Sequence, residues 1–347
     1  MSKMIKNSFY KKLTFEKFID AHYRARKNKT SRKELLKFEV DLESNIVNIM
    51  NNLINGNYNL GKYRVFTVYE PKERIIKCLP YIDRIVQQWY IYEFIKPYII
   101  PRLISTTCAC IDQRGTHYAV SKTQEYMRKM RQEYHNYYII KLDIKKYFYN
   151  IDKDILYGIM TKYIKDKKLL WLTKIFIYDS SDKLGIPIGN YTSQYFANIY
   201  LDKLDKYIKQ DLRIKYYVRY MDDMVILVRN KEECRVIMNN IKDYILRNLN
   251  LELNEKSRYY PNKLGVNFCG YIIYEDYKLM RKNSKKKIKN KIKLWRKLNK
   301  KNKLDKKRLL LSYKSWIGHA KHADSYRYRN KINKLIKDIT SSPLGIK

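Results

Sequence analysis

Three aspartates in two short segments carry the residue types that a metal-dependent transfer of nucleotidyl groups requires. Asp143 directly follows the apolar run 137–142, and Asp222 with Asp223 separates the apolar runs 216–220 and 224–228. Such a transfer uses two divalent cations about 3.5–4 Å apart, one at the attacking hydroxyl and one at the leaving group. Mg²⁺ prefers carboxylate oxygens and substrate phosphates. If the strands are neighbours, the three carboxylates meet at one edge of a sheet.

Each aspartate also has an ordinary explanation, because Asp is common in turns. The pair Asp222–Asp223 weighs against that explanation, since two adjacent like charges flanked by strand-forming residues are costly without a cation. We therefore expect a site that binds two Mg²⁺ ions, with Mn²⁺ as a substitute.

The elements expected around these residues mix helices and strands. The pattern predicts a strand at 137–142, an extended segment at 63–79, and hairpins at 216–228 and 268–281. Helices are expected at 31–55, 82–98, 152–164, 167–178, 191–210 and 231–247. Ser31 and Glu34 predict a capping box at the start of the first of these, and Gly56 its end. The absence of a repeating strand–helix–strand rhythm favours an α+β fold.

The charge of the chain indicates a polyanionic partner. Lys and Arg number 74 against 34 Asp and Glu, a formal net charge of +40, and nucleic acid is the usual partner of so basic a protein. No run is apolar enough to predict a membrane span or a signal peptide. Five Cys without a disulfide-like framework predict a reducing, cytoplasmic location.

Two segments concentrate this charge. Residues 281–310 contain sixteen Lys or Arg and one acid, with apolar residues at helical spacing, which predicts a folded basic helix. The second is the cluster Arg24, Arg26, Lys27, Lys29, Arg32 and Lys33. From the sequence it is either a solvated link between helices or a contact for phosphates.

The motifs resemble those of reverse transcriptases. Tyr220-Met221-Asp222-Asp223 resembles the catalytic signature of that family, and the segment from Asp143 to Phe148 resembles its first catalytic segment. The resemblance implies an α+β right-hand polymerase with an antiparallel palm sheet covered by helices on one face. The implied division is 1–86 N-terminal extension and fingers, 87–150 palm, 151–188 fingers, 189–281 palm and 282–347 thumb.

The same resemblance implies a role for several residues. Asp143, Asp222 and Asp223 are catalytic and hold metal together with the Ile144 carbonyl. Phe148 excludes the 2′-hydroxyl of a ribonucleotide, with neighbouring Tyr147 as the alternative gate. The other expected nucleotide-binding residues are Lys72, Arg74, Ile188, Gly189, Gln194 and Lys256. The expected primer grip is Phe268-Cys269-Gly270-Tyr271. The implied partners are template RNA, an RNA–DNA duplex and dNTPs.

A finer resemblance concerns the subclass. The segment 185–194 has Ser193-Gln194 where most relatives have Ser-Pro, and Ile188 where many have Gln. Together with Cys108-Ala109-Cys110, 114–117 and 315–319, it resembles reverse transcriptases of diversity-generating retroelements. That subclass implies error-prone copying at adenines and a small basic oligomeric accessory protein.

Two alternatives remain open at this point. Antiphage defence reverse transcriptases, which copy a dedicated non-coding RNA, share several of these features. The remote alternative is an inactive protein that only binds RNA, against which the three intact aspartates argue. Forty residues follow Lys307, so we expect neither an RNase H nor an endonuclease domain, and neither a retroviral product nor a full-length group II intron protein.

Overall fold

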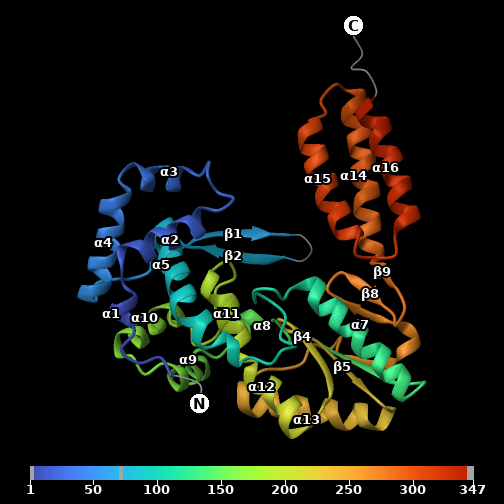
Figure 1. Cartoon of the computed structure of the whole chain (residues 1–347), viewed down its shortest axis with the longest axis horizontal. Coiled ribbons are helices and arrows are strands. Elements are labelled where there is room, and N and C mark those ends of the chain that lie inside the picture. The colour runs from blue at the N-terminus through green and yellow to red at the C-terminus, as the bar shows by residue number, and fades with distance from the viewer. Residues whose placement is uncertain (1–3, 70–72, 342–347) are drawn as a thin grey trace. The chain divides into compact units, whose positions relative to one another are not determined.

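The computed structural model describes residues 4–69 and 73–341, which form helices and antiparallel sheets (Figure 1). The chain divides into two compact units. The first unit comprises 1–112, 143–215 and 237–256, and the second comprises 113–142, 216–236 and 257–347. The boundaries of fingers, palm and thumb given above stay a prediction. No helix in the described part of the chain is both long and apolar enough to cross a membrane.

The first unit is mainly helical and carries one hairpin. Its N-terminal part contains α1 (Phe9–Lys12), α2 (Phe15–Arg26), α3 (Lys33–Val40), α4 (Leu42–Asn55), β1 (Arg64–Val68), β2 (Arg74–Cys78) and α5 (Tyr81–Tyr90). The π-helical segment η1 (Ile91–Ile95), α6 (Lys96–Tyr98) and the 3₁₀ turn η2 (Ile100–Arg102) follow. After residue 143 come α8 (Tyr147–Asn150), α9 (Lys153–Tyr163), α10 (Lys167–Ile177), α11 (Tyr191–Tyr200), α12 (Asp202–Lys206) and the π-helical η3 (Tyr207–Asp211).

Two expected helices are interrupted in this unit. The helix expected at 31–55 is two helices, because Asp41 leaves helical geometry with φ −132° and ψ 58°. Ser31 does not cap it either, since α3 begins after Arg32 and has no side-chain cap. The end at Gly56 is confirmed, with φ 78° in the left-handed region that glycine adopts readily. The helix expected at 191–210 is broken at Leu201.

The second unit is built on a four-stranded antiparallel sheet of order β4-β5-β3-β6. Its strands are β3 (Tyr138–Leu142), β4 (Tyr216–Tyr220), β5 (Asp223–Val228) and β6 (Arg258–Pro261), the last followed by the 3₁₀ turn η4 (Asn262–Leu264). Helix α7 (Thr116–Glu133) packs on β4 and β5. Helix α13 (Lys231–Leu249) begins in this unit and ends in the first. The expected strand at 137–142 is confirmed as β3, and the expected hairpin at 216–228 is confirmed as β4 and β5. Nearly all residues of the two hairpin strands are apolar and buried, as the apolar runs implied.

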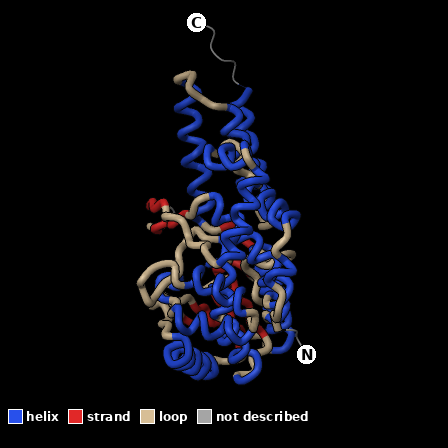
Figure 2. Tube along the Cα trace, turned by 90° about the vertical axis from the view of Figure 1, so that its left-hand side faces the viewer, coloured by secondary structure: helices blue, strands red, loops and turns tan. Residues whose placement is uncertain are grey.

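The rest of the second unit is a small sheet and a helical bundle. The hairpin expected at 268–281 is part of a three-stranded sheet, β7 (Val266–Phe268), β8 (Tyr271–Ile273) and β9 (Lys278–Met280). The helices α14 (Lys282–Lys300), α15 (Lys306–Ala320) and α16 (Tyr326–Ser341) lie side by side (Figures 1 and 2). Their shared core includes Ile288, Trp295, Leu309 and Ile336.

The basic segment 281–310 is therefore not one helix. Helix α14 ends at Lys300, and Asp305 caps α15 by accepting the backbone N–H of Arg308 at 2.9 Å. The one acid of the segment is thus an N-cap, which is a common role for Asp. The apolar spacing that predicted a folded basic helix is confirmed for α14, whose Ile288, Ile292 and Trp295 are buried.

Candidate active site

The aspartate pair lies at the turn of the β4–β5 hairpin. Tyr220 pairs with Asp223, which leaves Met221 and Asp222 as the two loop residues. Met221 has φ 56°, although a two-residue hairpin loop with positive φ at its first position normally has glycine there. A bulky residue held in this region is strained, and such strain often accompanies a functional turn. The turn holds Asp222 and Asp223 at one end of the hairpin.

A buried arginine on β4 is hydrogen-bonded to the backbone of this turn. Arg219 is 0% exposed, and its Nη1 donates a 3.0 Å hydrogen bond to the Met221 carbonyl. A buried guanidinium is costly unless it is paired and hydrogen-bonded, so its position in β4 is tied to the conformation of the loop. The role of Arg219 could not be predicted from the sequence, because one arginine in so basic a chain carries no signal.

Strand β3 runs antiparallel to β5 and ends at the same edge of the sheet. Leu142 pairs with Met224, the residue that follows Asp223, and Asp143 follows Leu142 in the chain. Within the sheet, the Lys141 ammonium forms an ion pair with the Asp223 carboxylate. Lys141 was not foreseen from sequence either. Its ammonium partly neutralises the Asp223 carboxylate at this edge.

In the first unit, the backbone around Asp143 is paired with residues 252–254. The Asn254 N–H donates to the Asp143 carbonyl at 2.7 Å, and the Lys145 N–H donates to the Glu252 carbonyl at 3.0 Å. These two bonds flank an antiparallel bridge between Ile144 and Leu253. In such a non-hydrogen-bonded pair the N–H and C=O of the central residue point away from the partner strand. The Ile144 carbonyl is therefore not used by this ladder.

The donor set fits a hard divalent cation in its chemistry. Carboxylate oxygens and a backbone carbonyl are ligands that Mg²⁺ accepts. Among residues 4–69 and 73–341, no group of three or more His, Cys, Asp and Glu side chains is gathered closely enough to form a metal centre. The assignment of Asp143, Asp222 and Asp223 as ligands thus stays a prediction.

Phe148 and Tyr147 differ in how they are held. Tyr147 is 2% exposed, and its hydroxyl donates to the Ala197 carbonyl at 2.6 Å. Phe148 is half-buried, and its carbonyl accepts the Ile186 N–H at 2.9 Å. The two rings contact edge to face with centroids 5.7 Å apart. The geometry favours Phe148 as the ring available to a nucleotide, because Tyr147 is part of the core.

The segment 185–194 contacts strand β2. The Lys77 N–H donates to the Ile188 carbonyl at 2.9 Å. Gly189 has φ +127°, and a Cβ there would lie 2.6 Å from the Lys77 carbonyl oxygen, so this position requires glycine. Gln194 is exposed on α11 and accepts a hydrogen bond from the Cys110 thiol at 3.2 Å. The expected residues Ile188 and Gly189 therefore lie on the hairpin that contains Arg74.

Three basic residues were expected to contact a nucleotide, and the structure describes two of them. Arg74 is exposed at the start of β2 and pairs with Val68. Lys256 is exposed, and its N–H donates to the Asn254 side chain at 3.1 Å. Since Asn254 is bonded to the Asp143 carbonyl, Lys256 is two residues from that contact. Lys72 lies outside the described residues.

The expected primer grip forms the turn between β7 and β8. Phe268 pairs with Tyr271, and the loop residues Cys269 and Gly270 have φ 47° and 93°, as a type I′ turn requires. The Tyr271 hydroxyl donates to the His319 carbonyl at 2.9 Å. Lys141, the partner of Asp223, lies 5.0 Å from the centre of the Phe268 ring. Within the second unit, the turn residues 268–271 and the aspartate turn are thus linked through one lysine.

Comparison with known proteins supports the resemblance that the sequence motifs indicated. Residues 69–273 match the family model described as reverse transcriptase (RNA-dependent DNA polymerase). Among curated proteins, the chain is 27% identical over 218 residues to a putative COX1/OXI3 intron 2 protein of Saccharomyces cerevisiae, covering 44% of this chain and 25% of that protein. It is 26% identical over 209 residues to the group II intron-encoded protein LtrA of Lactococcus lactis subsp. cremoris, covering 39% of this chain and 35% of that protein.

A solved structure shows the same fold. Apo telomerase from Candida tropicalis, truncated from its C-terminal domain, superposes with a TM-score of 0.50 at 12% identity, covering 69% of this chain and 60% of that one. At this identity the likeness concerns the fold alone. It confirms the expected α+β polymerase fold with antiparallel sheets.

Proposed function

The chain belongs to the reverse transcriptase family, and we propose that it is an RNA-directed DNA polymerase that copies an RNA template into DNA. The observation that carries the proposal is the strained hairpin turn that presents Asp222 and Asp223, at the sheet edge where β3 leads into Asp143. Because the chain spans only a quarter to about a third of its curated relatives, their further activities are not carried over.

The proposed mechanism assigns each residue a task. Asp143, Asp222, Asp223 and the Ile144 carbonyl would hold two divalent cations. When bound, these ions activate the primer hydroxyl and neutralise the departing pyrophosphate. Lys256, held beside the Asp143 backbone through Asn254, would donate a proton to that pyrophosphate. Gly189 lets the segment 185–194 approach the backbone of β2.

The basic helix α14 would bind the backbone of the template–primer duplex. Its exposed lysines Lys282, Lys286, Lys289 and Lys293 recur at helical spacing on the face opposite the buried Ile288 and Ile292. Each phosphate contact to a duplex contributes about 0.9 to the slope of log affinity against log salt concentration. Changing all four lysines to Glu should therefore weaken binding for any sequence and reduce that slope by about 2 to 4.

The matched control changes four exposed lysines of the first unit to Glu. These are Lys11, Lys37, Lys162 and Lys165. The net charge of the protein changes equally in the two variants. If both show the same slope of log affinity against log salt concentration, α14 is only a solvated surface.

We further propose that the enzyme copies adenines with errors, as a diversity-generating retroelement requires. Ile188 supports this, because it has no hydrogen-bonding group where a Gln side chain could contact the incoming nucleotide. Its side chain is half-buried and its carbonyl is already bound to Lys77, so a substitution changes the side chain without removing this backbone contact.

Ile188→Gln should therefore reduce errors opposite adenine. One well-placed hydrogen bond contributes about 0.5–1.5 kcal/mol, which corresponds to a roughly twofold to tenfold gain in discrimination if only a correct pair allows it. The test sequences the products that wild type and variant copy from an adenine-containing template, with Ile188→Leu as the control. Equal errors in an active variant would remove Ile188 from the mechanism. An accurate wild-type enzyme would favour the antiphage alternative.

A further inference from the structure

The segment 179–190, which contains the expected nucleotide contacts of the loop before α11, is held by a side chain at its C-terminal end. Asn190 is 4% exposed, and its Nδ2 donates to the Tyr63 hydroxyl at 2.8 Å. An Asn at the N-cap of a helix commonly accepts a backbone N–H of the first turn. Asn190 is the N-cap of α11, but its side chain makes no such bond. Its amide is engaged by Tyr63 instead.

The other end of the segment is held by a buried ion pair. Lys153, the first residue of α9, donates from Nζ to Asp179 Oδ1 at 2.9 Å and to the Ser180 hydroxyl at 3.1 Å. The side chains of Lys153 and Asp179 are 1% and 2% exposed. Replacing such a pair by apolar residues is often neutral or stabilising. A contribution to stability therefore explains this pair poorly, and what it positions must be considered.

The Tyr63 hydroxyl lies between these two ends. Burial, and then the Asp179 carboxylate, raises the pKa of Tyr63, whereas the hydrogen bond from Asn190 lowers it. An ionised carboxylate only accepts hydrogen bonds, so the hydroxyl proton is directed toward Asp179 and the hydroxyl oxygen accepts from Asn190. One hydroxyl group therefore connects both ends of the segment 179–190.

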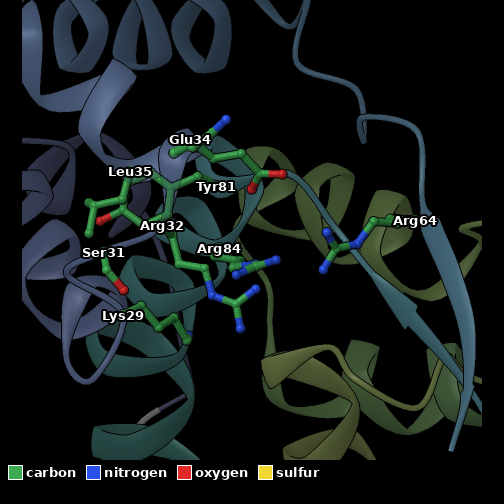
Figure 3. A pocket seen from close by; sticks show the side chains of 9 residues that line it. Lys29, Ser31, Arg32, Glu34, Leu35, Arg64, Tyr81 and Arg84 are labelled. Atoms are coloured by element: carbon green, nitrogen blue, oxygen red, sulfur yellow. The ribbon is translucent and has the colours of Figure 1, made fainter.

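Tyr63 also connects this segment to the β1–β2 hairpin. It directly precedes Arg64, the first residue of β1, and Lys77 in β2 is bonded to the Ile188 carbonyl. Arg64 lines a cavity of about 350 Å³ that is shown in Figure 3. Tyr63 is not among the described residues that line this cavity. Its contacts therefore suit it to hold neighbouring residues in place.

We propose that Tyr63, together with the buried pair Lys153–Asp179, is a positioning residue that holds the segment 179–190 in the conformation that binds a dNTP. The inference rests on the proposed function, because a dNTP is the substrate of that reaction. Without the Tyr63 hydroxyl, the Asn190 amide loses its partner and the segment populates other conformations. The apparent affinity for a ligand falls with the fraction of the protein that is competent to bind it.

The main test compares Tyr63→Phe with the control Tyr90→Phe. Both variants remove one hydroxyl and keep the ring, but the hydroxyl of Tyr90 is bonded to Thr173 at 2.8 Å in the core of the same unit. Single-turnover extension by one nucleotide gives the apparent dNTP affinity and the maximal rate separately. Tyr63→Phe should weaken dNTP affinity about twofold to tenfold, as the loss of one hydrogen bond implies. The maximal rate should stay within about twofold, and Tyr90→Phe should change neither constant.

A second pair of variants separates positioning from stability. Lys153→Met/Asp179→Asn and Lys153→Met/Asp179→Leu both remove the ion pair without leaving a buried charge. Only the first keeps an oxygen that can accept from the Tyr63 hydroxyl. The first should therefore retain nearly the dNTP affinity of wild type, and the second should lose about twofold to tenfold, at comparable melting temperatures.

Hydrogen–deuterium exchange of the full-length protein gives a readout that does not need enzymatic activity. Amides that open locally exchange faster, so peptides that cover residues 185–191 should exchange faster in Tyr63→Phe than in wild type. The same peptides should exchange in Tyr90→Phe as they do in wild type.

The inference is overturned if an active Tyr63→Phe enzyme binds dNTPs as wild type does, or if exchange at 185–191 is unchanged in it. It is also overturned if Tyr90→Phe loses as much dNTP affinity for a similar fall in melting temperature, because the effect would then be general destabilisation. An inactive wild type refutes the proposed polymerase activity, and the exchange measurement still decides whether Tyr63 holds the segment.

Discussion

Asp222→Asn is expected to reduce DNA synthesis by at least about a thousandfold while RNA binding stays nearly unchanged. Metal ions contribute several kcal/mol of charge stabilisation to nucleotidyl transfer, and about 4 kcal/mol corresponds to three powers of ten in rate. An amide has nearly the shape of the carboxylate but lacks its charge, so it holds Mg²⁺ poorly. We expect RNA affinity to come from Lys and Arg side chains that contact phosphates, and the substitution does not change these side chains.

The turn itself should survive this substitution. Its conformation depends on Met221 at φ 56° and on the hydrogen bond from buried Arg219 to the Met221 carbonyl. Neither involves the Asp222 carboxylate. A loss of activity with an unchanged melting temperature would therefore report on chemistry and not on folding.

The experiment measures primer extension and RNA affinity in parallel. Asp143→Asn is the second variant, with the same expected result. Asp243→Asn, on the exposed face of α13, is the control and should keep full activity. Activity at the wild-type level in either Asp222→Asn or Asp143→Asn would show that these carboxylates do not hold the catalytic ions.

The sequence predicts well those features that depend on neighbours in the chain. The β4–β5 hairpin follows from two apolar runs around a short polar turn, and both strands are buried as that pattern implies. The helix expected at 31–55 fails because its apolar stripe continues through Asp41, where the backbone turns nevertheless. Apolar spacing alone cannot reveal such a break, because the spacing is the same on both sides of Asp41.

Features that join distant segments were missed for a different reason. From the sequence, the basic cluster in the α2–α3 loop could be either a solvated link between helices or a contact for phosphates. Arg64 and Arg84, which line the cavity of Figure 3 together with Lys29 and Arg32, come from β1 and α5. One-dimensional patterns do not bring these elements together. Lys141 was overlooked similarly, because its partner Asp223 is joined to it only by the pairing of β3 with β5.

Phe148→Ala is expected to let the enzyme incorporate ribonucleotides. If the ring excludes the 2′-hydroxyl, its removal should raise the ratio of kcat/KM for an rNTP to that for the matching dNTP by on the order of a hundredfold, near the upper end of what shape selection in a pocket achieves. The backbone should hold its place, because the Phe148 carbonyl accepts the Ile186 N–H at 2.9 Å.

The control for this prediction is the adjacent tyrosine. Tyr147 is buried and its hydroxyl is engaged by the Ala197 carbonyl, so Tyr147→Phe should cost some stability and leave sugar selection unchanged. Single-nucleotide extension with each rNTP and dNTP measures both variants. If Phe148→Ala extends primers with the selectivity of wild type, the half-buried ring is only a packing residue. If Tyr147→Phe instead loses selectivity for dNTPs over rNTPs, sugar recognition depends on the buried Tyr147 ring, whose position is fixed by the hydrogen bond of its hydroxyl.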